Sequence, residues 1–195
     1  MARRTAAEAR AARLERRERH AAETDPTVVL NAAARFLELR SRSVEEMRRH
    51  LTAAAFPASL VESAIDRLLA LGMLDDRAFA AAWVESRDRA RPRGEAALRR
   101  ELGFKGIDRE TVAAVLADRR DAAQATAESD GIGSAGADEL AAERLLARNR
   151  AALLRVADPR ARRGRAYALL ARNGFDPGVC REVSARWLGL EAADD

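Results

Sequence analysis

The chain has 195 residues, of which 48% are hydrophobic and 34% charged, and its formal net charge is +4. This composition is typical of a globular protein and excludes a disordered or membrane-spanning chain. Only 4% of the residues are aromatic, and alanine, leucine, arginine and glutamate dominate, so helix formers are abundant and strand formers are scarce. We therefore expect an all-α protein.

The amino-terminal segment, residues 1–26, alternates alanine with arginine and glutamate and has no sustained apolar stripe. We expect a charged, disordered arm, with a lone solvent-exposed helix as the alternative. The segment lacks the apolar core of a signal peptide, and no apolar run in the chain approaches transmembrane length. These features favour a cytoplasmic protein that does not bind a membrane.

The chain after the arm contains a weak internal repeat in three copies. Each copy has a helix that ends in leucine, a short break, an apolar anchor five positions after that leucine, and a second amphipathic helix. The leucines and their anchors are Leu51 with Phe56, Leu102 with Ile107, and Leu170 with Phe175.

A residue that starts helices follows each anchor. If this residue is the cap, the anchor lies at N′ and packs on the N4 side chain, which makes a hydrophobic staple. The caps are Pro57, Asp108 and Asp176, and the N4 residues are Val61, Val112 and Cys180.

An upstream helix precedes each break, at residues 28–40, 76–89 and 138–154, which gives three units of three helices. Ser43 with Glu46 predicts a capping box for the middle helix of the first unit. Asp158 with Pro159 starts the middle helix of the third in the same way. We therefore expect an elongated array of three tandem three-helix repeats with an acidic tail. The repeats span 27–73, 74–120 and 138–190, and the tail spans 191–195.

The segment 121–137 separates the second and third units, and Ile132 is its only large apolar residue. Its alanine, glycine, serine, threonine and aspartate predict a flexible insertion. Gly131, Gly133 and Gly136 spell G-x-G-x-x-G, but the residues before them predict no strand. We interpret these glycines as part of the linker rather than as a dinucleotide-binding loop.

Few residues favour catalysis or metal binding. Asp75 and Asp76 could form an acid–base pair, but their place before a helix favours capping. Cys180, at a staple position, favours a small buried side chain over a nucleophile. Two histidines are too few for a His-based metal site, and no Walker-type loop is present. We expect no catalytic residue, cofactor or metal, and so no enzyme.

Basic residues gather in two places. Residues 87–105 hold seven basic residues against three acidic ones, and residues 143–172 hold nine arginines against two acidic residues. Such patches suit polyanions or acidic protein grooves. Solvated surface in an arginine-rich chain would look the same, since Lys105 is the only lysine. Charge alone leaves both interpretations open.

A series of residues in the second unit adds a more specific signal. It comprises Leu74, Asp75, Asp76, Arg77, Phe79, Ala80 and Trp83 with Arg87, then Gly94, Leu98, Arg99, Glu101 and Leu102, and finally Lys105, Gly106 and Ile107. In this order and spacing the series resembles the RecX family, whose members modulate the RecA recombinase. With the similar repeats on both sides, the resemblance spans about residues 28–190.

The resemblance implies a curved helical array that lies in the groove of a RecA–DNA filament and restrains filament growth, ATP hydrolysis and strand exchange. It also implies a part in DNA recombination, DNA repair and the SOS response. The arm and the insertion depart from the family and leave the angle between the second and third units open. No sustained heptad demands a dimer, so we expect a monomer.

The alternative is a basic helical protein that competes with RecA for single-stranded DNA, although few aromatic residues are present for base stacking.

The residues that carry the resemblance divide into a structural scaffold and a surface. We expect Gly106, like Gly174 in the third unit, to supply the positive φ that ends the middle helix. The scaffold comprises Leu74, Asp75, Asp76, Phe79, Trp83, Gly94, Leu102, Gly106 and Ile107. The side chains that we expect to face a partner are Arg87, Arg91, Arg93, Arg99, Arg100, Lys105, Arg162, Arg163 and Arg165.

Overall fold

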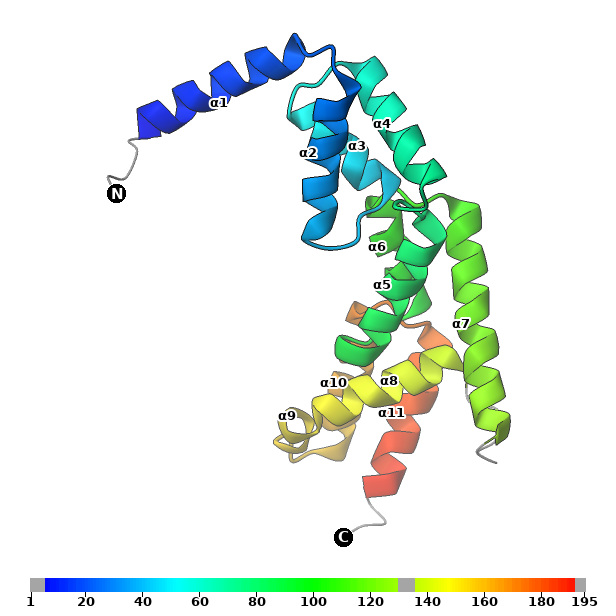
Figure 1. Ribbon diagram of the computed structural model, residues 1–195. Coiled ribbons are helices and arrows are strands. Elements are labelled where there is room, and N and C mark those ends of the chain that lie inside the picture. The colour runs from blue at the N-terminus through cyan, green and yellow to red at the C-terminus, as the bar shows by residue number, and fades with distance from the viewer. Residues whose placement is uncertain (1–5, 130–135, 192–195) are drawn as a thin grey trace. The chain divides into compact units, whose positions relative to one another are not determined.

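The computed structural model describes residues 6–129 and 136–191, which form helices and no strand (Figure 1). The all-α prediction is therefore confirmed. The chain divides into two compact units, Met1–Phe79 and Ala80–Asp195, and each has its own hydrophobic core. The elongated shape and the count of three repeats stay predictions. No described helix has the length and hydropathy that crossing a bilayer requires.

The first unit has a core in which three helices pack on one another. Its helices are α1 (Ala6–Ala21), α2 (Pro26–Glu38), α3 (Val44–Ala53), α4 (Ala58–Ala70) and the start of α5 (Asp76–Ala90), which continues into the second unit. The apolar stripes of α2, α3 and α4 meet around Met47, Leu51 and Ile65, which are fully buried. Leu74 joins this core, as expected of a scaffold residue.

Residues 6–21 of the predicted arm form a helix, so for this part of the arm the structure favours the alternative of an exposed helix over a disordered segment. Helix α1 has no buried residue, and its alanine, arginine and glutamate are strong helix formers. Its carboxyl end contacts the end of α3, where Arg17 donates to the Ala53 carbonyl at 3.1 Å and His20 Nδ1 lies 2.9 Å from the Ala54 carbonyl oxygen. The His20 ring also stacks on Phe56, with 4.1 Å between centroids. These contacts satisfy carbonyls that the last turn of α3 leaves open.

The second unit contains the remaining helices. They are α6 (Glu95–Phe104), α7 (Arg109–Ser129), α8 (Ala137–Arg148), α9 (Arg150–Leu154), α10 (Pro159–Arg172) and α11 (Pro177–Glu191). Helices α8, α10 and α11 pack around Leu146 and Leu170, and Cys180 is buried in the same core, as predicted. Leu102 on α6 and Leu116 on α7 are also fully buried.

The three predicted breaks share one backbone geometry. In each, the residue before the apolar anchor has a positive φ, which is 71° at Ala55, 81° at Gly106 and 83° at Gly174. The amide of the anchor donates to the carbonyl of the leucine five positions earlier, at 3.3, 3.1 and 3.4 Å. This pattern is the Schellman end of a helix. The positive φ predicted at Gly106 and Gly174 is confirmed, and Ala55 adopts it without being glycine.

Helix starts also follow the sequence. Ser43 Oγ accepts from the Glu46 amide at 3.1 Å, Asp108 Oδ1 accepts from the Thr111 amide at 2.8 Å, and Asp158 accepts from two amides at the start of α10. Both members of each predicted staple are buried, namely Phe56 and Val61, Ile107 and Val112, and Phe175 and Cys180.

Two predictions for residues 121–154 are wrong. Residues 121–129 belong to α7 rather than to a flexible insertion, because alanine, glutamine and glutamate extend a helix even where its residues have no large apolar side chain to bury. Residues 130–135, with Gly131 and Gly133, lie outside the described residues, as do 192–195 of the predicted tail. The predicted helix 138–154 is interrupted at Asn149, whose side chain donates to the Leu145 carbonyl at 2.8 Å and caps α8.

Candidate functional site

Glu101 on α6 gathers cationic and aromatic side chains of the motif. Trp83 Nε1 and Arg87 Nε, both from α5, donate to the same carboxylate oxygen at 2.9 and 2.6 Å. The Arg87 guanidinium lies 4.4 Å from the centre of the Trp83 ring, and the Lys105 ammonium lies 4.7 Å from it. Trp83, named above among the scaffold residues of the motif, is half-buried. Arg87 and Lys105, which the sequence predicts to face a partner, connect α5 and α6 through these contacts, and their part in binding a partner stays a prediction.

Arg93 also has contacts inside the second unit. Its Nε lies 3.4 Å from Glu101 Oε1, and a terminal nitrogen donates to the side-chain oxygen of Asn173 at the end of α10. The Nε atom is buried and forms no hydrogen bond in the described part of the chain. Arg93 therefore links the start of α6 to the end of α10.

Gly94, just before α6, and Gly174, just after α10, allow the two backbones to come into close contact. The Gly94 amide donates to the Asn173 carbonyl at 3.1 Å, and a Cβ atom at Gly94 would overlap the backbone of Gly174 and Phe175. A Cβ atom at Gly174 would in turn lie 2.5 Å from the Cβ of Ala97. Only glycine lets the two backbones meet here, which is consistent with the scaffold role that the sequence predicts for Gly94.

Two aspartates start the first helix of one repeat and cap the middle helix of the repeat before it. Asp76 Oδ1 accepts from the Val44 amide at 2.9 Å, and Asp138 Oδ2 accepts from the Glu95 amide at 3.0 Å. Val44 and Glu95 are the first residues of α3 and α6. Both carboxylates therefore satisfy open amides at the positive end of a helix dipole. Asp75 instead caps its own helix, by accepting from the third residue of α5 at 2.9 Å.

Arg119 on α7 is a structural cation that sequence reasoning missed. Its side chain is only 7% exposed, and it donates to Asp138 at 2.6 Å and to both oxygens of Asp88 at 2.8 and 2.9 Å. Burial opposes its charge, but the two carboxylates outweigh this effect and raise the pKa of the guanidinium. The sequence did not indicate these ion pairs, because Asp88 and Asp138 are both far from Arg119 along the chain.

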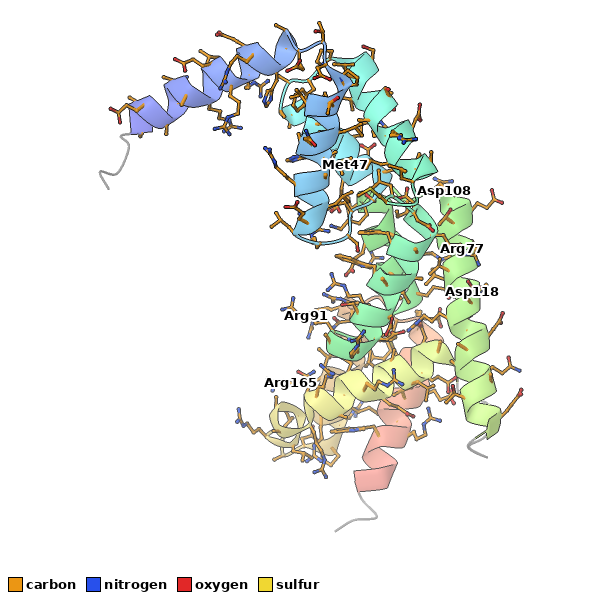
Figure 2. The ribbon with its side chains drawn as sticks, viewed as in Figure 1. Met47, Arg77, Arg91, Asp108, Asp118 and Arg165 are labelled. Carbon is orange, nitrogen blue, oxygen red and sulfur yellow. The ribbon has the colours of Figure 1, made fainter. Side chains whose placement is uncertain are left out.

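The remaining predicted partner-facing side chains fall into two groups. Arg99 pairs with Glu95 at 2.6 Å, and Arg162 donates to the Val156 carbonyl at 3.0 Å. The other group is exposed, and over residues 6–129 and 136–191 its side chains form no ion pair or hydrogen bond. It comprises Arg91, Arg100, Arg163 and Arg165, of which Figure 2 labels Arg91 just after α5 and Arg165 on α10.

Phe104, at the end of α6, was not singled out by the sequence patterns. Its side chain is 79% exposed, and it lies four residues after Arg100 on the same face of the helix. Leu102, two positions earlier, is fully buried. This offset points Phe104 away from the core, and it is the sequence signal by which Phe104 could have been found.

The environment of Cys180, which was considered above as a nucleophile, favours a structural role. Cys180 Sγ lies 3.6 Å from the Phe175 carbonyl, and burial raises the pKa of the thiol, which disfavours a nucleophilic thiolate. Where the structure describes the chain, no group of three His, Cys, Asp or Glu side chains could hold a metal ion.

Solved structures similar to this chain share its fold. The crystal structure of RecX from Lactobacillus salivarius has a TM-score of 0.67 and 18% identity, and the match covers 85% of this chain and 97% of that one. A second crystal structure, of a regulatory protein RecX, has a TM-score of 0.62 at 18% identity and covers 94% of this chain and 79% of that one.

Sequence comparison is more specific. Residues 30–68 match the model of the first three-helix domain of RecX, and residues 75–116 match that of the second. The regulatory protein RecX of Mycobacterium ulcerans is 34% identical over 158 residues, which cover 80% of this chain and 83% of that protein. The regulatory protein RecX of Thermobifida fusca is 29% identical over 167 residues, 86% of this chain and 80% of that protein. The chain therefore belongs to the RecX family.

Proposed function

We propose that the chain binds the filament of the RecA recombinase and inhibits its ATP hydrolysis, growth and strand exchange. Membership of the RecX family supports this proposal, since modulation of RecA is the role that the family implies. The chain would then act in the cytoplasm, in DNA recombination, DNA repair and the SOS response.

The observation that carries the proposal is the surface of α6, where Arg100 lies one turn before the exposed Phe104 and forms no ion pair or hydrogen bond with residues 6–129 or 136–191. Arginine and aromatic side chains are enriched in the parts of protein interfaces that contribute most to binding. Burial of a phenylalanine side chain contributes about 1.5–3 kcal/mol. Phe104 alone could therefore change the affinity for a partner by about tenfold or more.

The test is DNA-dependent ATP hydrolysis by the cognate recombinase, titrated with the full chain. The double variant Arg100→Glu with Phe104→Ala should need at least about tenfold more protein for half-inhibition. Its helix content and Tm should not change, because both side chains are exposed. The matched control is Arg67→Glu on α4, an exposed arginine, which should inhibit like the wild type.

Either of two results would contradict the proposal. Equal inhibition by the wild type and the double variant would exclude the α6 surface from the interface. A wild-type chain that leaves ATP hydrolysis unchanged at every concentration would exclude the proposed function itself.

Inhibition has a second route, which is competition for single-stranded DNA. A salt series of DNA binding by the chain alone separates the two routes, because binding to phosphates weakens steeply with salt. Inhibition far below the concentration of DNA sites, with weak DNA binding, indicates direct action on the filament. Inhibition that appears only at saturation of the DNA, and that disappears with salt in step with DNA binding, indicates competition.

A further inference from the structure

Helices α5, α7 and α8 of the second unit surround an open groove of about 540 Å³ (Figure 1). Val84 and Val115, which line it, are buried, and Leu140 on its α8 wall is half-buried. Much of the remaining lining is alanine, namely Ala81, Ala82, Ala122, Ala123 and Ala137. Alanine side chains let another helix approach closely. The lining therefore suits the apolar face of a further helix.

Polar contacts hold the three helices around this groove. Arg119 on α7 donates to Asp88 on α5 at 2.8 and 2.9 Å and to Asp138 on α8 at 2.6 Å. Arg148 on α8 also donates to the Ala90 carbonyl at the end of α5, at 2.6 Å. The walls are therefore in place before anything binds, and an occupant does not have to order them.

The edges of the groove carry charges of both signs. Glu85 on α5 and Asp118 on α7 are exposed carboxylates, and Arg144 on α8 is an exposed cation. Glu85 pairs with Arg89 at 2.9 Å, but both side chains are exposed, and such a pair contributes little to stability. Glu85 can therefore exchange Arg89 for a cation of an occupant. A fitting helix has cations on the side that faces α5 and α7 and an anion on the side that faces α8.

Helix α1 has an apolar stripe that the first unit does not cover. The helix is 16 residues long and buries none of them. A helix of this length is only marginally stable in water without packing, so a surface that covers it would stabilise it. The stripe consists of Ala7, Ala11 and Leu14, which are exposed and lie on one face at positions i, i+4 and i+7.

Charged side chains of opposite sign flank this stripe. At about 3.6 residues per turn, Arg10 and Arg13 lie on one side of it and Glu15 on the other. The side chains of these three residues form no ion pair or hydrogen bond with residues 6–129 or 136–191. The stripe and its flanks therefore match the lining and the edges of the groove in both polarity and charge.

We propose that α1 of one copy of this chain occupies the groove between α5, α7 and α8 of a second copy. The stripe lies on the alanines, the two arginines face Glu85 and Asp118, and Glu15 faces Arg144. Helix α1 and the part of α7 after residue 116 both lie outside the two matched domains, 30–68 and 75–116, so the contact joins segments that neither domain model covers. Since two different surfaces meet, copies join head to tail.

The contact is weak, because one helix face buries less than the roughly 1,200 Å² of a stable interface. A dilute chain therefore stays a monomer, which is the state that the sequence predicts, and copies join when they are concentrated. The inference does not rest on binding to the recombinase.

The experiment measures self-association of the full chain by sedimentation velocity over a concentration series. Leu14→Ala removes the largest side chain of the stripe and should lower the association constant about tenfold. Ala122→Gln should have a similar effect, because its longer side chain occupies the space of the stripe. The matched controls Leu39→Ala and Ala113→Gln, at exposed positions outside the groove, should associate like the wild type. Helix content and Tm should not change in any of the four variants.

A mixture of the Leu14→Ala and Ala122→Gln chains tests the head-to-tail geometry. The first chain keeps an intact groove and the second an intact α1, so the mixture should form heterodimers with the wild-type affinity and no longer assemblies. A mixture that does not associate would overturn the proposal. A loss in Leu14→Ala without a loss in Ala122→Gln would assign the contact to two α1 helices and would overturn it as well.

The same series tests whether α1 occupies the groove of its own chain. A wild-type chain that remains a monomer at every concentration would exclude the contact between copies. A Leu14 methyl resonance that shifts in Ala122→Gln at all concentrations would then place α1 in the groove of its own chain.

Discussion

Replacement of Ala55 by glycine should stabilise the first unit. Ala55 has a φ of 71°, and a left-handed conformation costs a residue with a side chain about 1–2 kcal/mol. Glycine removes this cost but loses about 0.5–1 kcal/mol more conformational entropy on folding. The expected gain in the free energy of unfolding is therefore about 0.5–1 kcal/mol. The Schellman hydrogen bonds stay in place, because they use only the backbone.

Thermal unfolding followed by circular dichroism measures the effect, which should be about 2–4 °C in Tm for each kcal/mol in a chain of this size. The reverse change, Gly106→Ala, should destabilise the second unit by a similar amount, because its φ is 81°. Gly174→Ala should cost more than Gly106→Ala, because the new methyl group would also overlap Ala97. A lower Tm for Ala55→Gly, or an unchanged Tm for Gly106→Ala, would refute the argument from backbone strain.

Three further substitutions test the contacts between helices and the pH dependence of stability. Gly94→Ala should lower the free energy of unfolding by about 1–3 kcal/mol, as overpacking does, and urea unfolding should show the loss. Asp138→Ala should cost about 2 kcal/mol in the same assay, because it uncaps α6 and removes one partner of the buried Arg119; an unchanged midpoint would count against this network. Burial lowers the pKa of His50, which stacks on Phe36 with 3.8 Å between centroids. The first unit should therefore lose stability as pH falls below about 6.5, the usual value for the unfolded state, and His50→Gln should show a flatter pH profile of Tm between neutral pH and about 5.5.

Local signals predicted the breaks and the caps well, because they depend on residues within one or two turns. Asp108 and Asp158 cap the helices that their sequence context indicates, and Gly106 and Gly174 have the φ that a Schellman end requires. The interruption at Asn149 was missed, since a single asparagine inside an alanine- and leucine-rich run is a weak stop signal.

The surface was harder to predict than the fold, because the sequence gives the number of charges and not their partners. Arg87 and Lys105 look like surface cations, yet one pairs with Glu101 and both lie over the Trp83 ring. The prediction that the nine basic side chains face a partner is untested as a whole. Among the described residues Arg100 forms no ion pair or hydrogen bond, and it lies one turn before the exposed Phe104, which makes it the first of the nine to test.

Because Asp76 caps α3 and Asp138 caps α6, each of these two helices depends on a segment that follows it in the chain. A repeat whose successor is unfolded loses the acceptor for the first amide of its middle helix, so neighbouring repeats should gain order together rather than one at a time. A boundary at residue 73, where the apolar pattern of the first repeat ends, would leave Ser43 with α3 but would separate α3 from Asp76, which accepts from its first amide. The smallest segment that carries all of the hydrogen bonds of the first repeat therefore extends into α5, and sequence periodicity and cooperative folding mark different borders along this chain.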